Sequence, residues 1–157
     1  MLCVVVLIGP PAAAARPALS LNVRIVGALN AQRSAHGLPR LRADPDLAAA
    51  ARSHSREMLL DGYFDHDSFD GTSFWKRINA FYDAYSAGEN LLEASPDVSA
   101  RRAVAMWMAS PEHRRNVLDP TWRDVGVSAL HVPVAPGIFD GGPVTVVTAD
   151  FGSRNSS

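Results

Sequence analysis

Apolar residues at helical spacing predict that the chain opens with a helix over residues 20–36. One face of this segment carries Leu21, Ile25, Val26 and Leu29. Gly37 follows at the position where a glycine commonly ends a helix. The sequence therefore places a helix, rather than a strand, ahead of a short connection over 38–43.

A second helix is predicted from residue 44 to about residue 61. Asp44 can accept hydrogen bonds from the first backbone amides, and Pro45 fits the first helical position. The apolar stripe that follows contains Leu47, Ala51, His54 and Met58. Gly62 is placed to end the helix. A histidine on such a stripe is expected to be a buried core residue.

Short helices and β-branched strands are predicted in the rest of the chain. Helices are expected at 73–81, 95–109 and 110–118, and the last two are each predicted to begin at a Ser-Pro pair. Strands are expected at 86–92, 125–132 and 144–151, with loops at 63–72 and 133–143. This order predicts one α+β domain, with no room for a second.

The first fifteen residues have the pattern of an export signal. Leu2 to Ile8 is an unbroken apolar run, which is far shorter than the roughly 20 residues a membrane-spanning helix needs. Ala13-x-Ala15 supplies the small residues of a cleavage site, after which residues 16–157 would form the mature domain. No Lys or Arg precedes the run, so either the signal is minimal or the true start lies upstream. We expect a secreted, extracellular or cell-envelope protein.

Composition narrows the classes of function. The net charge of −1 gives no general attraction to nucleic acid or to an anionic membrane, and no nucleic-acid partner is expected. Cys3 is the sole cysteine, so neither an internal disulfide nor a cysteine-based metal site can form. The mature domain must therefore be stabilised by its core alone.

Two of the five histidines are candidates for chemistry. His66 lies in the polar loop Phe64-Asp65-His66-Asp67-Ser68, and His113 follows Ser110-Pro111-Glu112 at the start of a short helix. Glu89 lies within a predicted strand, where a buried carboxylate needs a partner. Spacing alone does not show that these three side chains meet.

Four motifs in order resemble the superfamily of cysteine-rich secretory, antigen 5 and pathogenesis-related proteins, the CAP or SCP domain. They are Phe64-Asp65-His66-Asp67-Ser68, Ala87-Gly88-Glu89-Asn90-Leu91, the segment from Trp107 to Leu118, and Val125-Gly126-Val127. The opening Leu29-Asn30-Ala31-Gln32-Arg33 with Gly37-Leu38 also agrees. The resemblance extends over about residues 21–152 and is to the short bacterial branch without disulfides.

This resemblance implies a three-layer α-β-α sandwich with a central antiparallel sheet. It also implies a cleft where two histidines and two acids converge. His66, Glu89 and His113 match three of these positions, and Asn90, Trp107 and Asn116 match positions that would support the cleft.

The fourth position departs from the family pattern. The second acid usually stands five residues before the tryptophan, where this chain has Arg102. Glu93 or Asp83 would have to substitute for it in space.

His66, Glu89 and His113 could hold a divalent cation such as zinc. Arg102 could instead pair with Glu89 and repel a cation, so any metal is expected to bind weakly.

Three functions remain open from the sequence. The first is a secreted binding or interaction module with a lipid, cell-wall or protein partner. The second is a divalent-metal-dependent hydrolase that uses His66, Glu89 and His113, with Arg102 as a stabiliser of developing charge. The third is extracellular lipid or sterol binding through the exposed apolar segments Phe74-Trp75 and Ile138-Phe139. The incomplete acid set favours the binding module over an enzyme.

Overall fold

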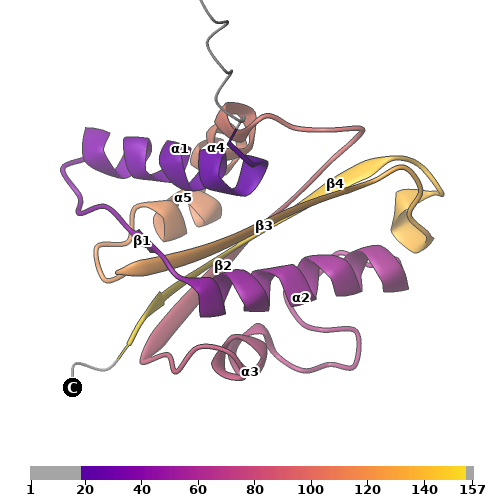
Figure 1. Cartoon of the computed structure of the whole chain (residues 1–157), viewed down its shortest axis with the longest axis horizontal. Helices are drawn as coiled ribbons and strands as arrows, with labels where there is room; N and C mark the ends of the chain where they lie inside the picture. Colours follow the sequence, from indigo (N-terminus) through magenta and orange to yellow (C-terminus); the bar gives the residue numbers. More distant parts are fainter. Residues whose placement is uncertain (1–18, 155–157) are drawn as a thin grey trace, which may run out of the picture.

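The computed structural model describes residues 19–154 and shows a mixed four-stranded sheet between two helical layers (Figure 1). The predicted signal segment 1–15 lies outside the described residues. The elements follow in the order α1 (Leu21–Ala35), β1 (Arg42–Ala43), α2 (Pro45–Asp61), α3 (Phe74–Asn79), β2 (Ser86–Ala94), α4 (Ala100–Ala109), α5 (Pro111–Val117), β3 (Asp124–Val132), η1 (Gly137–Phe139) and β4 (Val144–Ser153).

The sheet has the strand order β1-β3-β4-β2. The pairs β2–β4 and β3–β4 are antiparallel, whereas β1 runs parallel to β3. The α+β sandwich is therefore confirmed, but the sheet is mixed rather than purely antiparallel. The difference comes from β1, a two-residue strand inside the predicted connection 38–43.

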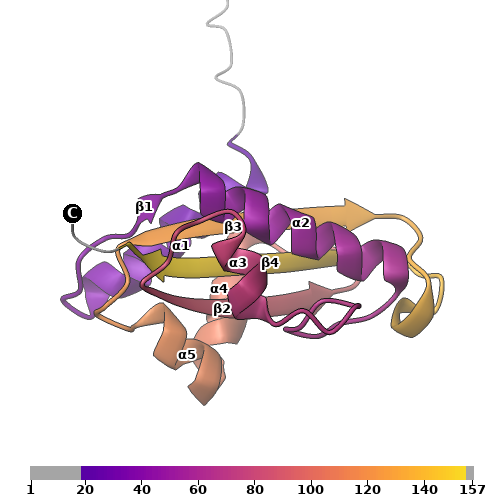
Figure 2. The ribbon, with the colours of Figure 1, turned by 90° about the horizontal axis from the view of Figure 1, so that it is seen from below.

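Alternate residues of β4 pack toward the two helical layers, which lie on opposite sides of the sheet in Figure 1. Val147, Ala149 and Phe151 pack in the cluster shared with α1 and α4. Val144 and Val146 pack against the end of α2. Figure 2 shows α2 crossing the sheet beside β3 and β4, with α3 over β2. The core thus lies on both faces of the sheet, and β2 forms one edge.

Local capping chemistry explains the helix boundaries that were predicted correctly. Asp44 Oδ1 accepts from the Asp46 and Leu47 amides, and Gly62 ends α2 with φ 70°. Ser20 caps α1. Gly126 has a different role, because a Cβ there would lie 2.0 Å from the Leu47 carbonyl carbon. It lets α2 pack directly on β3.

Two predicted helix starts at Ser-Pro pairs differ in the structure. The α4 helix begins at Ala100 rather than at 95, because Ser99 Oγ accepts from the Arg102 amide. Ser95 Oγ instead donates to the Pro143 carbonyl, 2.8 Å away. The α5 helix does begin at Pro111, but Ser110 makes no side-chain capping bond.

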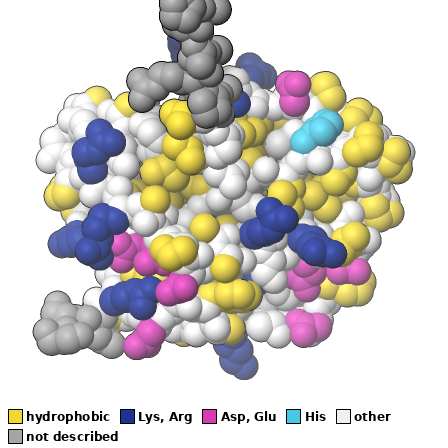
Figure 3. All heavy atoms as spheres, in the orientation of Figure 1, with side chains coloured by type: hydrophobic (Ala, Val, Ile, Leu, Met, Phe, Trp, Pro, Cys, Tyr) yellow, Lys and Arg dark blue, Asp and Glu magenta, His cyan; other side chains and the backbone are white. Residues whose placement is uncertain are grey.

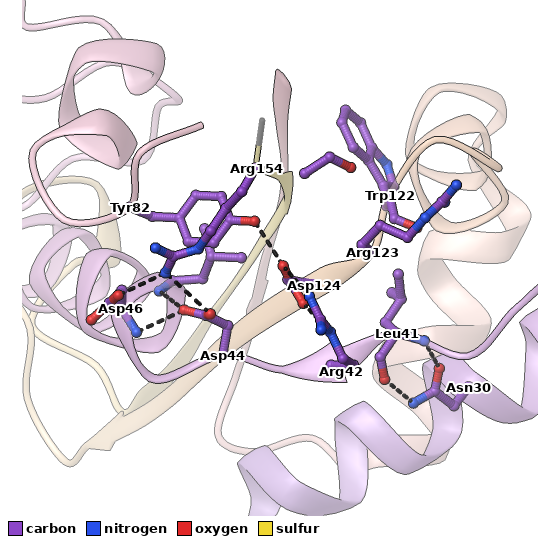
Figure 4. A network of polar contacts seen from close by, with 12 residues as sticks. Asn30, Leu41, Arg42, Asp44, Asp46, Tyr82, Trp122, Arg123, Asp124 and Arg154 are labelled. Carbon is purple, nitrogen blue, oxygen red and sulfur yellow. Dashed lines mark hydrogen bonds and ion pairs between the residues drawn. The ribbon is translucent and has the colours of Figure 1, made fainter. Parts of the chain in front are cut away.

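A polar network fastens β1 and the start of α2 to the end of β4 (Figure 4). Arg154 pairs with Asp46 at 2.8 Å and with Asp44 at 3.4 Å, and its guanidinium lies 4.2 Å from the centre of the Tyr82 ring. The Tyr82 hydroxyl donates to Asp124, which also pairs with Arg42. These contacts join distant segments at one corner of the sheet.

Several large apolar side chains are exposed at the opposite end of the sheet. Leu60, Val134 and Ile138 are all more than half exposed. On the face shown in Figure 3, hydrophobic side chains are most numerous toward the end where η1 lies in Figure 1. Within residues 19–154, no helix has the length and hydrophobicity to cross a membrane.

Candidate functional site

A cleft of about 610 Å³ lies at the open edge of β2. The connection between α2 and α3 forms one wall, and α5 with Trp122 forms the other. The residues that line it are Asp65, His66, Asp67, Phe74, Ala87, Gly88, Glu89, Asn116 and Trp122. The cleft therefore contains two of the three predicted chemical residues, in a wall of mixed polar and aromatic side chains.

His66 lies in a loop whose backbone carbonyls accept hydrogen bonds from two buried side chains. Arg77 Nη1 donates to the His66 carbonyl at 2.9 Å, and His54 Nε2 donates to the Asp65 carbonyl at 2.8 Å. His54 is fully buried, as its place on the α2 stripe predicted. Arg77 and His54 thus fix the loop backbone at two consecutive residues, Asp65 and His66.

Among the residues that the structure describes, the His66 ring is hydrogen-bonded to Glu89 alone. Its Nδ1 donates to Glu89 Oε1 at 2.8 Å, and half of the side chain is exposed. This hydrogen bond to a carboxylate raises the pKa of His66, with burial acting in the opposite direction. When neutral, the ring therefore keeps its proton on Nδ1 and offers Nε2 as an acceptor.

Glu89 is a buried carboxylate with both oxygens bonded. Its side chain is only 1% exposed. Oε1 accepts from His66, and Oε2 forms an ion pair with the buried guanidinium of Arg77. The acid therefore reaches a ligand mainly through the His66 ring.

The cation that pairs with Glu89 is Arg77 and not Arg102, which corrects the sequence-based expectation. Arg102 lies on the exposed side of the first turn of α4. Helix α3 instead carries Arg77 against β2, and its Nη2 contacts the carboxylate. Arg77 thus neutralises Glu89, and the arginine at the family's fourth position does not contact this acid.

Asp150 is a second buried acid that the sequence analysis missed. It lies directly opposite Glu89 in the β2–β4 register and is fully buried. Within residues 19–154 neither carboxyl oxygen has a partner at good hydrogen-bond geometry, although the Glu89 carboxylate lies close enough to favour a proton on Asp150. Burial, and then the negative charge of Glu89, raise the pKa of Asp150 well above that of an exposed aspartate. In the folded protein, Asp150 therefore holds its proton to a higher pH than an exposed aspartate does.

Glu93 and Asp83 do not replace the missing acid. Glu93 is exposed and lines a separate cleft of about 240 Å³ beside η1. Asp83 is exposed in the connection between α3 and β2.

His113 lies near His66 but does not line the cleft. Burial, and then the charge of His66, lower the pKa of His113. Its carbonyl accepts from Asn90 Nδ2 at 3.0 Å. The two predicted histidines are therefore close enough to interact electrostatically, across the edge of β2.

The three predicted supporting residues, Asn90, Trp107 and Asn116, form hydrogen bonds along the open edge of β2. Asn116 Nδ2 donates to the Glu89 carbonyl at 3.0 Å and to Asn90 Oδ1 at 2.9 Å. Trp107 Nε1 donates to the Leu91 carbonyl at 2.9 Å. An edge strand leaves such carbonyls unpaired, so these side chains satisfy them and attach β2 to α4 and α5.

The arrangement does not fit a zinc centre built from His66, Glu89 and His113. Within the described part of the chain, no three His, Cys, Asp or Glu side chains converge as metal ligands do. A cation at Glu89 would also meet the Arg77 guanidinium, which already neutralises the carboxylate. The site is better described as a hydrogen-bonded His–Glu–Arg group.

The sequence pattern around Asp150, Arg77 and Trp122 gave little indication that these residues belong to the site. Asp150 interrupts an apolar strand, which marks it as unusual, but its pairing with Glu89 depends on the strand register. Arg77 follows Lys76 in a short helix, and an arginine is ordinarily exposed. Trp122 follows the motif segment, and its Nε1 donates to the Asn116 carbonyl at 3.0 Å.

The apolar segments proposed for lipid contact lie in different places. Phe74 lines the cleft, whereas the neighbouring Trp75 is 40% exposed. Ile138 is 57% exposed and, with Phe139, lines the separate cleft beside η1. They do not form one continuous groove.

Comparisons with known proteins agree with the resemblance found in the sequence. The model of the cysteine-rich secretory protein family, CAP, matches residues 26–137. The uncharacterized protein YkwD of Bacillus subtilis is 35% identical over 105 residues, which cover 66% of this chain and 40% of YkwD. The chain thus spans less than half the length of this curated relative.

Solved structures show the same fold. An extracellular protein of Bacillus anthracis that contains an SCP domain superposes with a TM-score of 0.68 at 28% identity, covering 84% of this chain and 40% of that one. An outer surface protein of Borrelia burgdorferi also has a TM-score of 0.68, at 19% identity, and covers 87% of this chain and 97% of that one. The family match, the relative and the shared fold together show that the chain belongs to the cysteine-rich secretory protein (CAP) family.

Proposed function

We propose that the chain is an extracellular or cell-envelope binding module that receives its ligand in the cleft at His66. The observation that carries this proposal is the state of Glu89, which is buried and bonded through both oxygens. An acid held in this way orients a recognition group rather than acting on a ligand directly. Similarity to extracellular and outer surface proteins supports the location.

The lining of the cleft suits recognition of a polar ligand with a flat face. Phe74 and Trp122 supply aromatic surface, and Asn116 and His66 supply polar groups. The His66 ring is oriented by Glu89 before any ligand binds, which reduces the conformational entropy lost on binding. Fragments of a bacterial cell wall, with sugar rings and amide groups, have the required chemistry.

A metal-free hydrolase is the second candidate, and one observation favours it. A half-exposed histidine with Nδ1 bonded to a carboxylate, and with no bond from Nε2 to the described residues, is the arrangement of a general base. A raised pKa, however, keeps more of the ring protonated near neutral pH, which weakens it as a base. Binding therefore remains the better-supported function.

A titration with soluble cell-wall fragments tests both candidates. We expect muropeptides to shift the NMR signals of the His66 imidazole and the Trp122 indole in a saturable way. His66→Ala should abolish this binding, whereas His36→Ala, which removes an exposed histidine at the end of α1, should leave it unchanged.

The same samples decide between binding and hydrolysis. Mass spectrometry after long incubation should return the muropeptides intact. Cleavage products formed by the wild type and not by His66→Ala would replace the binding proposal with the hydrolase. The absence of any saturable shift would reject cell-wall fragments as the ligand class.

A further inference from the structure

A second cleft, of about 610 Å³, lies on the other side of α5 from His66. It is formed by the end of α4, by α5 and by the turn that leads into β3. The residues that line it are Met108, Ala109, Pro111, Arg114, Arg115, Leu118, Asp119 and Pro120. No residue is shared with the lining of the His66 cleft, and we call this feature the α5 groove.

The α5 groove is positively charged, although the whole chain has a net charge of −1. Arg114 and Arg115 are exposed, and neither side chain forms an ion pair or hydrogen bond with residues 19–154. Arg123 Nη1 donates to the carbonyl of Pro120, at the rim of the groove. The pKa of the neighbouring Arg33 is lowered, mainly by burial. The negative charge of Asp119 raises this pKa, and the positive charge of Arg123 lowers it.

The acidic side chains nearby offset this charge only in part. Asp119 lines the groove, and its Oδ1 accepts from the backbone amide and the hydroxyl of Thr121. Glu112 does not line the groove. The groove therefore offers two guanidinium groups to an anionic partner.

The floor of the groove is apolar and also contains unpaired backbone groups. Met108 and Leu118 are partly buried there, with Pro111 and Pro120 beside them. The carbonyls of Met108 and Ala109, at the end of α4, accept no hydrogen bond from the described residues. An extended peptide can donate backbone N–H groups to such carbonyls, whereas an acyl chain cannot.

We propose that the α5 groove binds a short acidic peptide segment of a partner protein, with an apolar side chain on the floor and one or two carboxylates against Arg114 and Arg115. Arginine forms paired hydrogen bonds with a carboxylate, and such contacts give charge complementarity as well as specificity. The groove and the His66 cleft share no lining residue, so this proposal does not rest on the function proposed for the cleft.

Selection from a phage-displayed library of random short peptides tests the proposal. The full-length protein should enrich peptides in which Asp or Glu stands beside a large apolar residue. Synthetic versions should bind the double variant Arg114→Gln/Arg115→Gln about tenfold or more weakly than the wild type, because two charge-assisted contacts are lost. Their affinity for the wild type should also fall as salt is added.

Matched variants separate the groove from other effects. Arg101→Gln/Arg102→Gln removes the same charge from exposed positions on α4 that do not line the groove, and should leave the affinity unchanged. With no ligand in the cleft, His66→Ala should also leave it unchanged. Thermal melting checks that each variant is folded.

Three results would overturn the proposal. One is a selection that yields no peptide, or peptides without acidic residues. Another is equal binding to the wild type and to Arg114→Gln/Arg115→Gln. The third is sodium oleate binding the groove while the selected peptides do not, which would identify an anionic lipid as the occupant.

Discussion

Replacing Asp150 by asparagine tests whether this buried carboxyl carries a proton in the folded protein. Asparagine has nearly the same shape and is neutral at every pH. Because the folded-state pKa of Asp150 is raised, the folded chain holds a proton that the unfolded chain has released. The stability from this group is fully present below the unfolded pKa, near 3.9, and is lost as pH rises toward the folded pKa.

The size of the effect follows from one bound proton. Each pH unit between the two pKa values should lower the free energy of unfolding of the wild type by about 1.4 kcal/mol through this group. Asp150→Asn removes that dependence. Its stability relative to the wild type should therefore increase by about 2–3 kcal/mol over two pH units within this window.

Urea unfolding, followed by the fluorescence of the buried Trp107 and Trp122, measures this difference. The titrations would be repeated from about pH 4.5 to about pH 7. Asp83→Asn, which changes an exposed aspartate, should differ from the wild type by the same small amount at every pH. If the Asp150→Asn difference is equally flat, Asp150 is ionised in the folded state and the reasoning fails.

Four further predictions concern the site and two glycine positions. Arg77→Met should lower the free energy of unfolding by about 3–5 kcal/mol, because Glu89 is left buried without its cation, and adding Glu89→Gln should recover much of this loss in urea titrations. Glu89→Gln alone should lower the pKa of His66, measured by NMR titration of the imidazole, and an unchanged pKa would contradict the hydrogen bond as its cause. Gly126→Ala should destabilise the fold by about 3 kcal/mol or more, since its Cβ would meet the backbone of α2 at 2.0 Å. Gly27 lies at an exposed position of α1, where an added Cβ would meet nothing within 4 Å. Gly27→Ala should therefore raise stability by about 0.5–1 kcal/mol in thermal melts.

Sequence reasoning predicted the features that depend on local chemistry. Helix α2 begins after Asp44 and ends at Gly62 as expected, because a capping carboxylate and a glycine with positive φ act within one turn. The start of α4 was wrong because Ser95 bonds to Pro143, a partner that only the tertiary fold brings close. The strand β1 was missed because two residues carry no periodic pattern and pair only with the distant β3.

The same limit applies to the site. The motifs pointed to His66 and Glu89, and the structure joins these two side chains by a hydrogen bond. The motifs did not reveal Arg77 or Asp150, because their contacts with Glu89 depend on how α3 packs and on the register of β2 with β4. The motif comparison therefore identified the substitution at Arg102 but assigned its consequence to the wrong arginine.

The position of α5 has a thermodynamic consequence. This helix carries Asn116 in the His66 cleft and Arg114 and Arg115 in the α5 groove, and Asn90 and Asn116 attach it to the edge of β2. A ligand that shifts α5 from one side changes the binding free energy on the other. By linkage, the two affinities must then change by the same factor in both directions, so α5 would act as a reciprocal coupling element between cleft and groove.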